Sequence, residues 1–118
     1  MATITATRTP YVSIDKMKYS WAGFAANADV GTSVTDQNLN DRSVQVTGTF
    51  TGSLSITIQG SNDGTNWFTL TDQGGAALTF TAAGGGMIAE LTEYIRPIAD
   101  AGAGGGDADV EIFLKGRK

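Results

Sequence analysis

The clearest alternation of apolar and polar residues runs over Ser53–Gln59, where Leu54, Ile56 and Ile58 occupy every second position. A period of two puts these three side chains on one face of a β-strand. The Asn-Asp-Gly triplet at residues 62–64 then supplies residue types that tolerate positive φ, as a tight turn requires. The pattern therefore predicts a β-hairpin whose first strand buries one face.

The return strand of this hairpin is predicted from Trp67, Phe68 and Leu70, which resume the apolar pattern. We expect the hairpin to be the nucleus of one sheet, with buried side chains at Leu54, Ile56, Ile58, Phe68, Leu70 and Phe80. Trp67 has two interpretations, a stacking platform for a sugar or a structural anchor between sheets. Its place just after a turn favours the anchor.

Short segments rich in β-branched and aromatic residues predict the other strands. They are Tyr11–Asp15, Met17–Phe24, Ser43–Phe50 (with Val44 and Val46 inward), Leu78–Thr81, Met87–Leu91, Tyr94–Ile98 and Val110–Lys115. Clusters of Gly, Asn and Asp predict a long loop at Ala25–Asn40, a break at Ala82–Gly86 and a flexible turn at Asp100–Asp109. Many short strands separated by such turns predict an all-β fold, a single-domain antiparallel β-sandwich or jelly roll.

The N-terminal segment forms a separate prediction. Its first ten residues, MATITATRTP, alternate Thr with Ala and Ile and end in Pro10. Such a segment has too little apolar surface to fold alone, but it suits strand addition to an exposed sheet edge. We therefore expect an extended arm over residues 1–18 that orders against a neighbouring subunit, followed by one domain over residues 19–118.

Composition excludes several function classes. The 118 residues suit one domain, and they include no cysteine and no histidine. Disulfides, thiolate metal sites and a histidine base are therefore excluded. Asp107 and Asp109 lack the wider ligand spacing of a calcium loop, which favours a solvated turn. We expect no enzyme activity, cofactor, metal or small-molecule ligand.

Charge and hydropathy narrow the partners. The net charge of −4 disfavours nucleic acid, which would require clustered Lys and Arg. No apolar run approaches the length of a membrane span. The N-terminus also lacks the apolar region of a secretion signal, so we expect synthesis in a cytoplasm and no membrane partner.

Four residues are candidates for contacts with other chains. Trp21 lies close to Tyr19 in an aromatic segment, where it is either part of the core or a contact to a neighbouring chain. Arg42 and Arg96 lie in or beside predicted strands, where they either pair with acidic side chains or contact a partner. The candidate interface is therefore Trp21, Tyr19, Arg96 and Arg42.

Three motifs carry a family resemblance: GSNDG-x-x-W at Gly60–Trp67, LTF at Leu78–Phe80 and YIRP at Tyr94–Pro97. In this order, over Arg42–Lys118, they resemble small structural proteins of tailed bacteriophages, in particular capsid decoration (cement) proteins. The resemblance implies a protein that binds and stabilises the outside of an icosahedral capsid. It also implies a homotrimer, a major capsid protein as partner and a place on the virion surface.

A second resemblance leaves an alternative open. SNDG-x-x-W followed by YIR is also similar to discoidin-type carbohydrate-binding domains, in which loops at one end of a jelly roll hold the sugar. That similarity implies a carbohydrate- or host-surface-binding module of a phage tail or baseplate. The loops predicted at Ala25–Asn40 and Asp100–Asp109 contain no aromatic residue, which favours the capsid interpretation.

Overall fold

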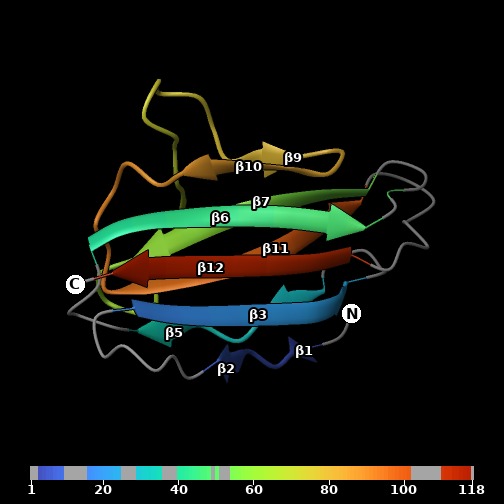
Figure 1. Cartoon of the computed structure of the whole chain (residues 1–118), viewed down its shortest axis with the longest axis horizontal. Helices are drawn as coiled ribbons and strands as arrows, with labels where there is room; N and C mark the ends of the chain where they lie inside the picture. The colour runs from blue at the N-terminus through green and yellow to red at the C-terminus, as the bar shows by residue number, and fades with distance from the viewer. Residues whose placement is uncertain are drawn as a thin grey trace.

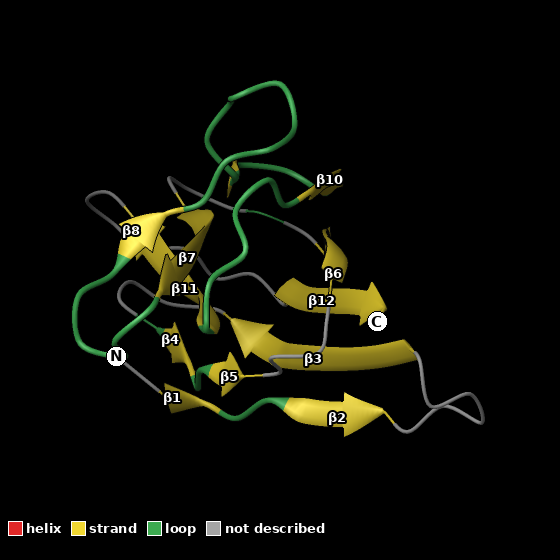
Figure 2. Cartoon of the chain, turned by 90° about the vertical axis from the view of Figure 1, so that its left-hand side faces the viewer, coloured by secondary structure: helices red, strands yellow, loops and turns green. Residues whose placement is uncertain are grey.

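The chain forms a β-sandwich of two sheets packed face to face, seen edge-on in Figure 2. The computed structural model describes residues 3–9, 16–24, 29–35, 40–48, 50, 54–101 and 110–117. Within these ranges every regular element is a strand. The all-β, single-domain prediction is therefore confirmed.

The first sheet has seven strands. They are β1 (Thr3–Ile4), β4 (Val30–Gly31), β5 (Val34–Thr35), β7 (Leu54–Ser61), β8 (Phe68–Thr69), β9 (Thr79–Phe80) and β11 (Tyr94–Ala101). The strand order is β1-β4-β11-β7-β8, and β5 and β9 also pair with β11 and β7. The β1–β4 pair is parallel, so this sheet is mixed and departs from the purely antiparallel prediction.

The second sheet has five antiparallel strands in the order β10-β6-β12-β3-β2. They are β2 (Thr7–Thr9), β3 (Lys16–Phe24), β6 (Asn40–Gly48), β10 (Gly84–Met87) and β12 (Val110–Arg117). In Figure 1 this sheet faces the viewer, with β12 between β6 and β3.

The hydrophobic core lies between the two sheets. Its buried apolar residues are Trp21, Phe24, Val44, Val46, Ile56, Ile58, Leu70, Leu78, Ile88, Ile95 and Ala99. The inward positions predicted at Val44, Val46, Ile56 and Ile58, together with Leu70, are thus confirmed, and Phe80 is partly buried against the core. The side chain of Leu54 lies outside the described residues.

The prediction that Phe68 is buried in the core is wrong, because 45% of its surface is exposed. Its strand β8 has only two residues, and it lies at the edge of the seven-stranded sheet. Phe68 pairs in register with Gly60, which offers no side chain for it to pack against. An apolar residue in a short edge strand is only partly covered by its neighbours.

The predicted boundaries between Ala82 and Leu91 are also wrong. The glycine-rich break contains β10, whose residues Gly84–Met87 pair with β6. The strand expected from Met87 onward ends there, apart from one bridge between Ile88 and Asp72. A glycine run can serve as an edge strand, since one neighbour fixes its backbone.

Pro97 occupies an unusual position inside the seven-stranded sheet. Proline lacks the N–H group that a central strand needs on one side. The neighbouring segment is divided into β4 and β5, which pair with β11 at Ile98 and at Tyr94–Ile95, so the ladder is interrupted beside Pro97. A Cβ on Gly31 would lie 2.7 Å from Pro97 Cδ, so only glycine fits there. The polar stretch predicted as one loop thus contributes two short strands.

The N-terminal segment pairs with this chain's own strands. β1 pairs with β4 in one sheet and β2 pairs with β3 in the other, so the segment spans the lower side of the sandwich in Figure 2. The backbone oxygen of Ile4 accepts a hydrogen bond from Thr32 N at 2.8 Å, and the side chain of Ile4 packs against the core. The predicted role of the arm against a neighbouring subunit stays a prediction.

Two other predictions lie wholly or partly outside the described residues. The strand at Tyr11–Asp15 falls wholly outside them, as do Asp107 and Asp109 in the predicted flexible turn. The C-terminal strand is confirmed as β12 from its backbone pairing.

Candidate interaction surface

The turn after β7 is held by its own side chains. Ser61 Oγ donates a hydrogen bond to Asp63 Oδ1 (2.9 Å) and accepts from the N–H groups of Asp63 (3.2 Å) and Gly64 (2.9 Å). Asp63 Oδ1 accepts two further backbone bonds, from Thr65 and Asn66, each at 2.8 Å. Asn66 Nδ2 donates to Asp63 Oδ2 at 2.9 Å. The turn is therefore a closed local network rather than a two-residue hairpin turn.

These bonds also fix the charge of the turn. The hydrogen bonds from Asn66, followed by those from Thr65 and Ser61, lower the pKa of Asp63 well below its ordinary value of 3.8. The carboxylate therefore stays ionised at neutral pH. Gly64 has a φ of +78°, the left-handed conformation that glycine adopts without strain, and it alone in the Asn-Asp-Gly triplet has positive φ.

The turn positions Trp67 on the outer face of the seven-stranded sheet. There the guanidinium carbon of Arg96 lies 4.1 Å from the centroid of the Trp67 ring, a cation–π contact. Tyr94 meets the same ring edge-on, with 6.5 Å between centroids. Arg96 Nε donates to Gln59 Oε1 at 3.0 Å, and Arg96 and Gln59 are register partners on β11 and β7. We call these four residues the Trp67–Arg96 cluster.

All four side chains of the Trp67–Arg96 cluster are partly buried. Partial desolvation lowers the pKa of Arg96 from its ordinary value, but a guanidinium remains protonated at neutral pH. The cluster therefore presents a positive charge held against the Trp67 ring, which Tyr94 contacts edge-on. Such an arrangement suits binding, since Trp, Tyr and Arg dominate the energetics of protein interfaces.

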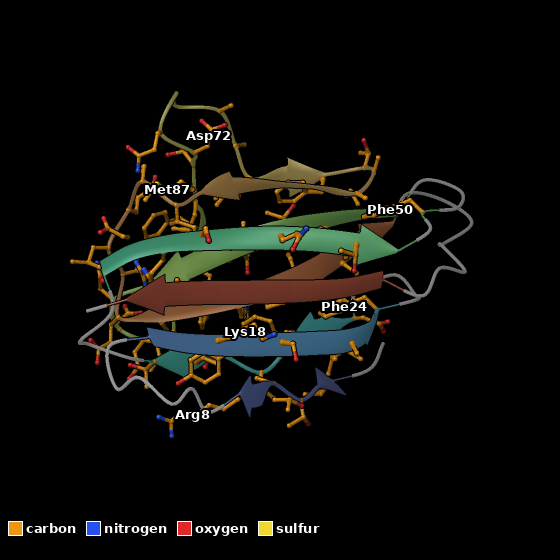
Figure 3. The ribbon with its side chains drawn as sticks, viewed as in Figure 1. Arg8, Lys18, Phe24, Phe50, Asp72 and Met87 are labelled. Atoms are coloured by element: carbon orange, nitrogen blue, oxygen red, sulfur yellow. The ribbon has the colours of Figure 1, made fainter. Side chains whose placement is uncertain are left out.

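A second surface surrounds Arg42, which is buried. Arg42 donates from Nη1 to Thr92 O (3.1 Å) and from Nη2 to Glu90 O (2.7 Å), and desolvation lowers its pKa. Near it a shallow recess is rimmed by Met87 and Leu91, which are 41% and 66% exposed. Figure 3 shows Met87 at the same corner of the sandwich as Asp72.

The Glu90 carboxylate joins this corner of the sandwich to Thr71 by two hydrogen bonds. Its Oε1 and Oε2 accept from Thr71 N (2.8 Å) and Thr71 Oγ1 (2.6 Å). Desolvation raises the pKa of Glu90, but these hydrogen bonds outweigh it and the net pKa is lowered. The polar groups here serve to join segments of the chain.

The four residues predicted as an interface do not come together. Trp21 is 1% exposed and its Nε1 donates to Thr32 O at 2.8 Å, so it belongs to the core. Tyr19 packs partly buried against the same core. Among the described residues, Arg42 bonds to the backbone carbonyls of Thr92 and Glu90 rather than to an acidic side chain. Of the four, Arg96 is the one that the structure places in the Trp67–Arg96 cluster.

The interpretation of Trp67 as an anchor between the sheets is wrong, because its ring lies on the outer face of the seven-stranded sheet. The alternation of side chains along a strand could have predicted this placement. Leu70 is buried, so Phe68, two positions earlier, shares its face, and Trp67 takes the opposite face.

Among the described residues, no three His, Cys, Asp or Glu side chains lie close enough together to hold a metal ion. The same part of the chain contains no helix long and apolar enough to cross a membrane.

No family model and no curated protein matches the sequence. The structure is similar to that of the SPBc2 prophage-derived protein YomS, with a TM-score of 0.56 and 12% identity over 91% of this chain and 99% of YomS. Weaker likenesses include PirA (TM-score 0.43, 12% identity, 92% and 97% covered) and the Schizosaccharomyces pombe Cnp3 cupin domain (0.44, 6%, 96% and 60%). The weaker two scores carry no argument, and the YomS likeness shows a shared fold.

Proposed function

We propose that this protein is a structural protein of a bacteriophage particle, and specifically one that binds and stabilises the outside of the capsid. The observation that carries the proposal is the similarity to a prophage-derived protein over almost the whole of both chains. The motif resemblance at Gly60–Trp67 and Tyr94–Pro97 supports it independently. The proposed activity is binding, without chemistry or a cofactor.

The surface of the sandwich suits this role. A stable interface takes roughly 800 Å² from each partner. The outer face of the seven-stranded sheet offers the Trp67–Arg96 cluster and, beyond it, the partly buried Thr57 and Ile98 on neighbouring strands. The partner that we propose is the major capsid protein.

The test mixes purified protein with capsids assembled without it and measures binding by co-sedimentation. We expect saturable binding, and we expect decorated particles to lose their DNA at a higher temperature than undecorated ones. Capsids that bind no protein at saturating concentration contradict the proposal.

The proposal includes a homotrimer, formed in solution or on the capsid. Cyclic symmetry would let three small domains share one contact region on the shell. Light scattering after size exclusion tests the free protein, and a cryo-EM map tests the bound one. A monomer in both measurements would contradict the proposed trimer but not the proposed capsid binding.

A carbohydrate-binding role remains the second candidate, because Trp67 is partly exposed on a sheet face. One face of its ring is covered by the Arg96 guanidinium, which reduces the surface available for sugar stacking. A glycan array separates the candidates. Saturable glycan binding without capsid binding would favour the carbohydrate-binding module.

A further inference from the structure

The Arg96 guanidinium is held in place before any partner arrives. Trp67 supports its flat face and Gln59 fixes its Nε edge. An arginine on a free surface loses much side-chain entropy when it is immobilised by a partner. Here Trp67 and Gln59 have already restricted it, so a ligand gains the contact at a lower entropic cost.

Most of the donors of Arg96 make no hydrogen bond to another described residue. A guanidinium carries five N–H donors in a planar fork. Among the described residues Arg96 makes one hydrogen bond, through Nε to Gln59, and no ion pair. With respect to the described residues, the terminal Nη groups therefore retain the pair of parallel donors that binds a carboxylate in bidentate fashion.

The chemistry around the fork favours a negatively charged group on a protein. The chain as a whole has a net charge of −4, so a cation fixed against the Trp67 ring is a distinctive feature of this surface. Arg96 is partly buried and lies against the Trp67 ring, which reduces solvent screening of a salt bridge made there. Aromatic rings beside an arginine also give the packed, water-excluding surroundings that interface hot spots need.

We propose that the Trp67–Arg96 cluster is the site at which this protein docks onto the shell, with Arg96 binding a carboxylate side chain of the capsid protein. This inference rests on the proposed function and names the contact. Trp67 and Gln59 act as positioning residues, because they orient the guanidinium, and Arg96 makes the contact itself.

The decisive variant is Arg96→Lys, which keeps the charge and removes the planar fork. We expect its affinity for undecorated capsids to fall about tenfold or more, as for the loss of a close interfacial charge pair. Arg96→Gln should lose at least as much, and Trp67→Leu should weaken binding by releasing the guanidinium. Thermal unfolding of each variant, followed by circular dichroism, shows whether the fold is intact.

The matched control is Lys18→Gln. It makes the same change in net charge as Arg96→Gln, but it lies on β3 in the other sheet (Figure 3), and we expect it to bind capsids like the wild type. If wild-type protein binds capsids and folded Arg96→Lys binds equally well, the docking site is overturned while the proposed function stands. If the wild type does not bind capsids, the proposed function itself fails.

A cryo-EM map of the decorated capsid gives the second readout. We expect the outer face of the seven-stranded sheet against the shell, with a capsid Asp or Glu side chain at the Nη groups of Arg96. A map in which Arg96 faces solvent overturns the inference.

Discussion

The two faces of the seven-stranded sheet are made from alternate residues of the same strands, yet they differ in almost every property. On the inner face Ile56, Ile58 and Ile95 are 0–2% exposed and pack against the other sheet. On the outer face Gln59 and Arg96 are partly exposed and carry hydrogen-bonding groups. A slip of one residue in register would exchange the two sets. One strand can thus supply stability on one side and recognition on the other, which makes the two separable by mutation.

The largest effect should come from Ile56→Ala on the inner face. Removing a fully buried isoleucine side chain leaves a cavity and should lower the free energy of unfolding by about 2–5 kcal/mol. Urea denaturation measures this, with Thr57→Ala on the outer face as the control. A loss below about 0.5 kcal/mol would mean that our register is wrong.

Arg42→Met sharpens the comparison by testing a cation placed inside the fold. Arg42 satisfies the carbonyls of Glu90 and Thr92, so its loss leaves buried acceptors unpaired. We expect destabilisation of about 2–4 kcal/mol in urea denaturation, with capsid affinity of the folded fraction unchanged. In Arg96→Lys the pattern should be reversed, with binding reduced more than stability.

Gly60→Ala tests how closely the inner face is packed. A Cβ at this position would lie 2.6 Å from Leu70 Cδ2 and 2.7 Å from Thr92 Oγ1. We expect a loss of about 1–3 kcal/mol from overpacking, measured as a shift of the urea midpoint. The control is Gly84→Ala in an edge strand, where the nearest atom, in Phe80, is at an ordinary 3.6 Å.

The smallest effect should come from Asp63→Asn in the turn that positions Trp67. The pKa of Asp63 is lower in the folded protein than its ordinary value of 3.8, so its ionised form stabilises the fold at neutral pH. That contribution is lost as the pH falls below 3.8 toward the folded pKa. We therefore expect the stability difference between wild type and variant to shrink on going from pH 7 to pH 3. A constant difference contradicts a role for the charge.

The inner face could be predicted from the sequence, because a period of two over Leu54–Gln59 directly reports which side chains share a face. The outer cluster could be predicted only in part. Arg96 was a candidate from its place in a strand, but 29 residues separate it from Trp67 in the sequence. Their contact depends on the register of β11 against β7 and on the bonded turn after Ser61. Neither is encoded in local periodicity.

The shortest strands were the least predictable part of the fold. The glycines of β10 and the polar residues around β4 and β5 have low strand propensity, and their strand conformation comes from pairing with a neighbour. The position of Trp21 was left open for a similar reason. An aromatic residue in a strand fits either a core or an interface, and only the partner sheet decides between them.

The central position of β12 in its sheet has a consequence for how the protein is made. β12 follows β3 and β6 in the chain, yet both of them pair with it. While the ribosome is still translating residues 110–117, β3 and β6 have no strand between them, and their facing edges present unpaired backbone groups. Such edges promote aggregation, and pairing between segments this distant in sequence is slow. The five-stranded sheet can therefore be completed only after synthesis has passed Arg117, so a premature stop before β12 should yield aggregates rather than a smaller folded domain.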